Sequence, residues 1–151
     1  MLTKLKAAHA ELRVAITELE TETRRFEPDE ASLSAARLKL TRASSRRRAL
    51  IDQEIFPTLR DLTPEQKDRI DGLRRTASEV AVLSSRHIGD WTMRAILADW
   101  QGYRRASKTM RSAMLQRIGE EGAILYPLLG DRIEDSAVRP GYVARQAAIP
   151  M

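Results

Sequence analysis

The sequence contains no cysteine and only two histidines, His9 and His87. Without cysteine there can be no disulfide framework, no iron–sulfur cluster, no thiolate zinc site and no cysteine nucleophile. Two histidines are too few to build an all-histidine metal site from one chain. These absences exclude the commonest thiol and metal chemistries.

Glycine and proline are also scarce, with seven and six residues respectively in a chain of 151. An all-β sandwich needs turn residues at short intervals, so that class is excluded. The sequence has no run of about 18 apolar residues, so we expect no membrane span. Its first residues turn acidic at once and lack the apolar region of a secretory signal, so we expect a cytoplasmic protein.

Helical periodicity is present in four segments of what the length predicts to be one domain. Apolar residues recur at steps of three and four along roughly 3–25, 30–58, 64–89 and 90–130. These narrow stripes and short connections predict an all-α fold, an antiparallel up-down-up-down four-helix bundle over residues 1–130. Residues 131–151 show no period and contain Pro140, Gly141 and Pro150, so they predict an irregular C-terminal tail.

Several residues predict where these helices begin and end. Asp29 is a candidate N-cap of the second helix, and Asp90 of the fourth. Thr63 is followed by Pro64 and then Gln66, which predicts an N-cap, a proline at the first helical position and a capping box. Helix ends are expected near Pro57, Gly89, Pro127 and Gly130.

Polar residues interrupt the apolar stripes at five positions: His9, Arg47, Glu54, Arg117 and Glu121. In an up-down bundle, the start of the first helix and the ends of the second and fourth lie at the same end. All five side chains are therefore predicted to meet in one layer. A buried charge is costly unless it is paired, so a cluster with both signs of charge is expected.

The sequence leaves four interpretations of this layer open. The first is a structural salt-bridge cluster in which Arg117 and Glu121 pair at i,i+4 spacing. The second is a pocket for a small anion, and the third is an iron or zinc site built from His9, Glu54 and Glu121. In the fourth, the arginines extend to solvent and no site exists. Because arginine cannot ligate and repels a cation, no metal is our first expectation.

One segment resembles the fourth-helix motif of the hemerythrin-like (HHE cation-binding) family, in which His-x-x-x-Glu precedes an apolar pair and a proline. It runs from Arg117 through Glu121 to Leu125-Tyr126-Pro127. The segment from Arg47 to Phe56-Pro57 is an internal repeat that resembles the family's second helix, and Ala8-His9 resembles the start of the first. The resemblance covers roughly residues 5–130 and implies a hemerythrin-like bundle.

The chain departs from that family at the metal ligands. His9 and Glu121 match ligand positions, but Arg117 stands where the fourth-helix histidine is expected. Arg47 and Ile51 replace the second-helix histidine and glutamate, and the third-helix histidine falls near Ile70. Asp52 and Glu54 are candidate shifted substitutes for these ligands. The resemblance therefore implies a bundle that has lost its di-iron site, with a buried polar cluster of His9, Arg47, Asp52, Glu54, Arg117 and Glu121 in its place.

Basic residues are concentrated in two helical segments. Residues 31–60 hold seven Lys/Arg and two Asp/Glu, and residues 91–130 hold six and three. No nucleic-acid-binding motif accompanies Arg46, Arg48, Arg105 or Arg111, so they predict a solvated basic face and not a nucleic-acid partner. His87 is expected to be exposed at a helix end.

The sequence holds no catalytic motif that predicts an enzyme. We expect a non-enzymatic interaction or regulatory module with a homodimer or protein partner and no membrane association. The alternatives are a metal-binding protein with an altered iron or zinc site, and a small-anion or nucleic-acid binder that uses the basic helices.

Overall fold

The computed structural model describes the backbone of residues 1–148 and the side chains of residues 1–130. Its elements are helices throughout: α1 (Leu2–Thr23), α2 (Glu30–Ala49), a π-helix η1 (Leu50–Ile55), a 3-10 turn η2 (Phe56–Thr58), α3 (Pro64–Asp90), α4 (Met93–Ala98) and α5 (Trp100–Ala148). No strand occurs in residues 1–148, which confirms the all-α prediction. None of the helices searched in this part of the chain is both long and apolar enough to cross a membrane.

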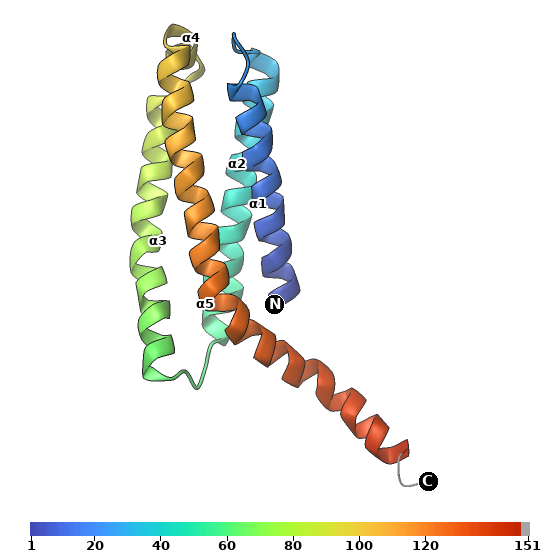
Figure 1. Ribbon diagram of the computed structural model, residues 1–151. Coiled ribbons are helices and arrows are strands. Elements are labelled where there is room, and N and C mark those ends of the chain that lie inside the picture. Colours follow the sequence, from blue (N-terminus) through green and yellow to red (C-terminus); the bar gives the residue numbers. More distant parts are fainter. Residues whose placement is uncertain (149–151) are drawn as a thin grey trace.

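The long helices α1, α2, α3 and α5 lie side by side, and the short helix α4 sits at one end of them (Figure 1). The backbone of α1 packs along α2 and also along α5. Helix α3 packs on α5, whereas its backbone makes few close contacts with α2. The α2–α3 side of the molecule is therefore the less tightly packed one.

The predicted starts of α2 and α3 are confirmed. Asp29 accepts a hydrogen bond from the Ser32 backbone N–H at 3.0 Å. Thr63 and Gln66 form the reciprocal capping box, and Pro64 occupies the first helical position. Each cap satisfies backbone donors that would otherwise lack partners at the start of the helix.

The end of α2 changes its helical winding. The chain passes from α-helix to the π-helix η1, and the 3-10 turn that contains Pro57 then ends the element. A π-helix has about 4.4 residues per turn, against 3.6 in an α-helix. Ile55, which is fully buried, consequently takes the core-facing position that an uninterrupted α-helix would give to Glu54. The predicted inward orientation of Glu54 is therefore wrong.

The fourth long helix begins later than the sequence predicted. Asp90 is the last residue of α3 and does not cap α5. Thr92 caps the short helix α4, and its side chain accepts a hydrogen bond from Ala95 N. Asp99 then accepts a hydrogen bond from Gly102 N at 2.9 Å at the start of α5. Because Thr92 and Asp99 act as caps, the long helix begins at Trp100, about ten residues after the start expected at Asp90.

Residues 131–148 are helical, so the prediction that 131–151 form an irregular tail is wrong for them. Residues 149–151 lie outside the described part of the chain. Helix α5 runs through Pro127 and Gly130, where it was expected to end, and its C-terminal part leads away from the other helices (Figure 1). A proline inside a helix removes one backbone hydrogen bond and tends to kink or end the helix. Helix α5 nevertheless continues beyond Pro127.

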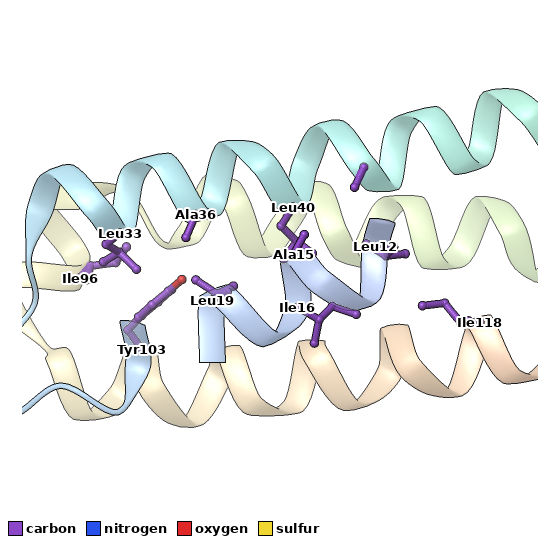
Figure 2. Close-up of a cluster of buried hydrophobic side chains, with 11 residues drawn as sticks. Leu12, Ala15, Ile16, Leu19, Leu33, Ala36, Leu40, Ile96, Tyr103 and Ile118 are labelled. Atoms are coloured by element: carbon purple, nitrogen blue, oxygen red, sulfur yellow. The ribbon is translucent and has the colours of Figure 1, made fainter. Parts of the chain in front are cut away.

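The core consists of two groups of buried apolar side chains, one toward each end of the long helices. The first joins α1, α2, α4 and α5, and Tyr103 lies across it beside Leu19 (Figure 2). The second joins the start of α1, the segment 50–56, the first half of α3 and residues 125–129. Helix α3 contributes only Ile70 and Leu73 as buried residues. Its second half is thus poorly anchored by apolar packing.

Candidate functional site

Four buried polar side chains meet between α1, α2 and α5, and we call them the Glu121 layer: His9, Arg47, Arg117 and Glu121. Their exposed fractions are 0%, 5%, 8% and 1%. The layer lies between the two apolar groups of the core. The structure thus brings together four of the residues that the sequence singled out.

Both carboxylate oxygens of Glu121 accept hydrogen bonds from nitrogen donors. Its Oε1 atom accepts from His9 Nε2 at 2.9 Å. Its Oε2 atom accepts from Arg47 Nη1 and, at 3.2 Å, from Arg117 Nε. Charge-assisted bonds of this kind are roughly twice as strong as those between neutral groups. Glu121 is therefore the hub that links three helices.

Neighbouring residues hold most of the layer's remaining polar atoms, whereas the buried Arg47 Nε has no hydrogen-bond partner. The Tyr126 hydroxyl lies 2.5 Å from His9 Nδ1. A neutral imidazole satisfies both of its contacts when Nε2–H donates to Glu121 and Nδ1 accepts from Tyr126. On the other side, Arg117 donates to Thr76 Oγ1 at 2.6 Å and to the Leu73 carbonyl at 2.8 Å. These two bonds tie α3 to the layer.

Electrostatics favour the ionised form of Glu121. Burial by itself raises the pKa of this carboxyl, but the hydrogen bond from His9 and the charge of Arg47 outweigh it and leave the pKa below its usual value. Burial also raises the pKa of Tyr126, so its hydroxyl stays protonated and able to donate. Two guanidiniums face one carboxylate, and the layer therefore keeps a net positive charge when His9 is neutral.

Two residues predicted for this cluster lie outside it. Glu54 is exposed and receives an ion pair from Lys4 at 3.2 Å, because the π-helix turns it away from Glu121. Asp52 is also exposed, although it lines a small cavity of about 20 Å³ that adjoins Arg47, Arg117 and Glu121. The alternative metal site built from His9, Glu54 and Glu121 is therefore wrong as a set of ligands. No group of three or more His, Asp or Glu able to hold a metal exists among the residues that the structure describes.

Sequence reasoning missed the partners at the edge of the layer. Tyr126 was noted only as part of an aromatic–proline pair, yet its hydroxyl completes the contacts of His9. Tyr126 stands five residues after Glu121, about 140° around an α-helix, so the spacing alone gave no signal for this contact. Thr76 gave no signal either, because its contact depends on how α3 sits against α5.

A second polar contact is buried further along α5. Arg111 is 8% exposed, and its guanidinium donates to Ser107 Oγ at 3.2 Å and to Thr23 Oγ1 at 3.3 Å. Burial lowers the pKa of Arg111, and the nearby Glu20 counteracts this. The prediction that Arg111 belongs to a solvated basic face is wrong, because its side chain ties α5 to the end of α1.

His87 also departs from expectation. It is half-buried in the last turn of α3, where its ring lies 6.1 Å from that of Tyr103, measured between centroids. Burial lowers the pKa of His87, the charge of Arg37 lowers it further, and Asp90 raises it. The imidazole is thus held neutral beside a pocket between α2 and α3.

Comparison with known proteins gave no match to this chain. No protein-family model matches it. No curated protein matches it. No solved structure matches it either.

Proposed function

We propose that this protein is a non-enzymatic helical bundle of hemerythrin-like descent that has lost its di-iron site and acts as an interaction or regulatory module. The proposal includes the antiparallel up-down-up-down arrangement of α1, α2, α3 and α5. Short connections support it, since 24–29 join α1 to α2 and 59–63 join η2 to α3. Its four long helices also lie side by side (Figure 1).

The observation that carries the proposal is the complete occupation of Glu121 by protein donors. A carboxylate that ligates a metal must offer at least one oxygen to the ion. Here Oε1 is held by His9 and Oε2 by the guanidiniums of Arg47 and Arg117. Arginine has no lone pair to donate and stays charged, so it takes the place of a cation beside the carboxylate.

Charge balance supports the same interpretation. Two buried guanidiniums repel an incoming divalent cation, while the ion pair supplies the compensation that a buried carboxylate needs. His9 uses one ring nitrogen on Glu121 and the other on Tyr126, so neither is free to ligate. The layer is suited to fixing the relative positions of three helices and not to holding a reactive ion.

Elemental analysis of the purified full-length protein tests the proposal. The protein is incubated with Fe(II) or Zn(II), passed through a desalting column and measured for bound metal, with a visible spectrum of the same sample. We expect metal well below one equivalent and no absorption from oxo-bridged iron. Glu120→Ala is the matched control for Glu121→Ala, because Glu120 is the exposed neighbour on α5.

A metal-loaded protein would contradict the proposal. Iron or zinc near one or two equivalents that is lost in Glu121→Ala and kept in Glu120→Ala would show that the layer still binds metal. The arginines would then have to move aside for the ion, and the protein would have kept the metal-binding function of the family it resembles. A homodimer or protein partner and a cytoplasmic location stay predictions of this proposal.

A further inference from the structure

A pocket opens between α2, α3 and α5, away from the Glu121 layer, and we call it the α2–α3 pocket. Its volume is about 320 Å³, which falls within the range of small-molecule sites. Its apolar wall is formed by Leu40, Trp91, Tyr103, Met110 and Met114. Aromatic rings and flexible methionines of this kind adapt to an apolar ligand of variable shape.

Helix α3 lines the pocket with two polar side chains and one apolar side chain, Ile88, which is 46% exposed. Ser84 and His87 line the pocket, while the large apolar residues Val82 and Leu83 on the same helix are 55% and 64% exposed. An amphipathic helix that closed the bundle would point such apolar residues inward. The space is therefore left open because the second half of α3 buries none of its large apolar side chains.

Positive charge lines the pocket, and the carboxylate nearest to Arg48 along the chain, Asp52, lines two adjoining cavities together with Arg48 and not the pocket itself. Arg37 and Arg48 are both in the lining, and no Asp or Glu is. The guanidinium of Arg37 donates to the Trp91 carbonyl at 2.5 Å and lies 5.6 Å from the ring centroid of Tyr103. Arg48 forms no ion pair or hydrogen bond with any described side chain, although its Nε atom is buried. A guanidinium in this condition is an open site for an anion.

Buried polar atoms without partners gather at the same place. Among the side chains that the structure describes, four buried nitrogen or oxygen atoms lack a hydrogen bond. Two of them belong to residues that line this pocket, Arg48 Nε and His87 Nε2. The third, the Tyr103 hydroxyl oxygen, also belongs to a lining residue and has the Ser107 hydroxyl beside it, and the fourth is Arg47 Nε in the Glu121 layer. Native proteins rarely leave such atoms unsatisfied, because each one loses the hydrogen bonds it had to water. A bound polar group would restore them.

We propose that the α2–α3 pocket binds a small amphipathic carboxylate, whose anionic head lies at Arg48 and His87 and whose apolar body lies against Tyr103, Met110 and Met114. The apolar wall of the pocket favours a ligand with an apolar body, and the guanidiniums of Arg37 and Arg48 favour a negatively charged head. This site does not include the Glu121 layer, so the inference stands whether or not that layer once held metal.

Isothermal titration of the full chain with three ligands of one chain length tests this assignment. The ligands are octanoate, octanol and octylamine, which share the apolar body and differ in the charge of the head. We expect octanoate to bind at least about tenfold more tightly than octanol, the effect of one charge-assisted hydrogen bond. Octylamine should bind more weakly than octanol, because its ammonium group meets Arg37 and Arg48.

Two variants locate the binding. Arg48→Gln should weaken octanoate about tenfold and leave octanol within twofold, whereas Arg105→Gln, an exposed arginine on α5 outside the lining, should change neither. Ser84→Phe places a ring in the pocket from a half-exposed position on α3 and should abolish binding of both ligands. Thermal melting of each variant checks that the fold is kept.

A Trp100→Phe background gives a second readout, because the chain has only two tryptophans and Trp91 alone lines the pocket. Octanoate should then change the emission of Trp91. Equal affinity for octanoate and octanol, preference for octylamine, or binding that survives Ser84→Phe would each overturn the proposal. Absence of heat and of any emission change at millimolar octanoate would do the same.

Discussion

Arg47 and Arg48 are neighbours in sequence, yet they serve two regions of opposite character. Arg47 points into the Glu121 layer, where each charged side chain has a partner of opposite charge or a polar acceptor. Arg48 lines the α2–α3 pocket, where guanidiniums stand without a carboxylate. Successive residues of a helix point about 100° apart, so one turn of α2 serves both regions.

The difference lies in what α3 presents to each region. At the layer, α3 reaches across through Thr76 and the Leu73 carbonyl, which both accept from Arg117. At the pocket, α3 presents Ser84 and His87 and leaves a cavity. The comparison shows that buried charge alone does not make a binding site. A site also needs space that the protein leaves unfilled, which is about 320 Å³ at the pocket and about 20 Å³ beside the layer.

The largest effect is expected from removing the hub of the layer. Glu121→Leu leaves the guanidiniums of Arg47 and Arg117 buried without a carboxylate, and it should lower the free energy of unfolding by about 3–5 kcal/mol. Glu120→Leu, at the exposed neighbouring position, should change it by less than about 0.5 kcal/mol. Urea unfolding followed by circular dichroism measures both. Equal losses of unfolding free energy in the two variants would mean that the Glu121 layer does not stabilise the fold.

A smaller loss is expected when one arginine is removed. Arg117→Leu deprives Glu121 of one donor and removes the bonds from Arg117 to Thr76 and the Leu73 carbonyl. His9 and Arg47 still hold the carboxylate. The free energy of unfolding should fall by about 2–3 kcal/mol. A shift in the melting temperature near zero would show that the Arg117–Glu121 ion pair gives no net stabilisation after its desolvation cost.

Acid should remove the contribution of Glu121 selectively. Because the folded pKa of this carboxyl lies below its unfolded value, the stabilisation is present above the unfolded pKa of about 4.3 and is lost as the pH falls through the folded pKa. The stability difference between the wild type and Glu121→Gln should therefore shrink as the pH falls below about 4.3. Urea titrations across this pH range measure it, and a difference independent of pH would contradict the ionised carboxylate.

The smallest effect, of opposite sign, is expected at the pocket. Ser84→Phe fills open space without breaking a hydrogen bond of the structure, so it should raise the free energy of unfolding by about 0.5–2 kcal/mol. Ser85→Phe, one position along and exposed, should not stabilise the fold. A loss of stability in Ser84→Phe would mean that the pocket walls are rigid and cannot accept the ring.

The sequence predicted those parts of the fold that depend on local chemistry. The capping box at Thr63 is a local exchange of hydrogen bonds, and it is confirmed. Arg117 and Glu121 stand at i,i+4 spacing on one helix, so their proximity also follows from local geometry. Arg47 and His9 join them because regular helical periodicity holds as far as each residue.

Other features could not be predicted because they depend on tertiary packing. Glu54 was placed by counting in α-helical steps through a segment that winds as a π-helix. The orientation of Arg48 depends on the gap between α2 and α3, which no single helix encodes. Thr92 caps the short helix α4, whose Ile96 packs in the core, and Asp99 accepts a bond at the start of α5. The role of cap expected for Asp90 therefore could not be assigned from the residue types alone.

The π-helix at Leu50–Ile55 has a consequence for chain length. It holds one residue more than an α-helix needs to join Arg47 to Ile55, so deletion of the exposed Gln53 would let the segment rewind as α-helix. Ile55 would then follow Arg47 by seven positions and still face the core. Deletion of Ser45, by contrast, would rotate every later residue of α2 by about 100°. The chain should thus tolerate the loss of a residue within this one turn and not in the helix before it.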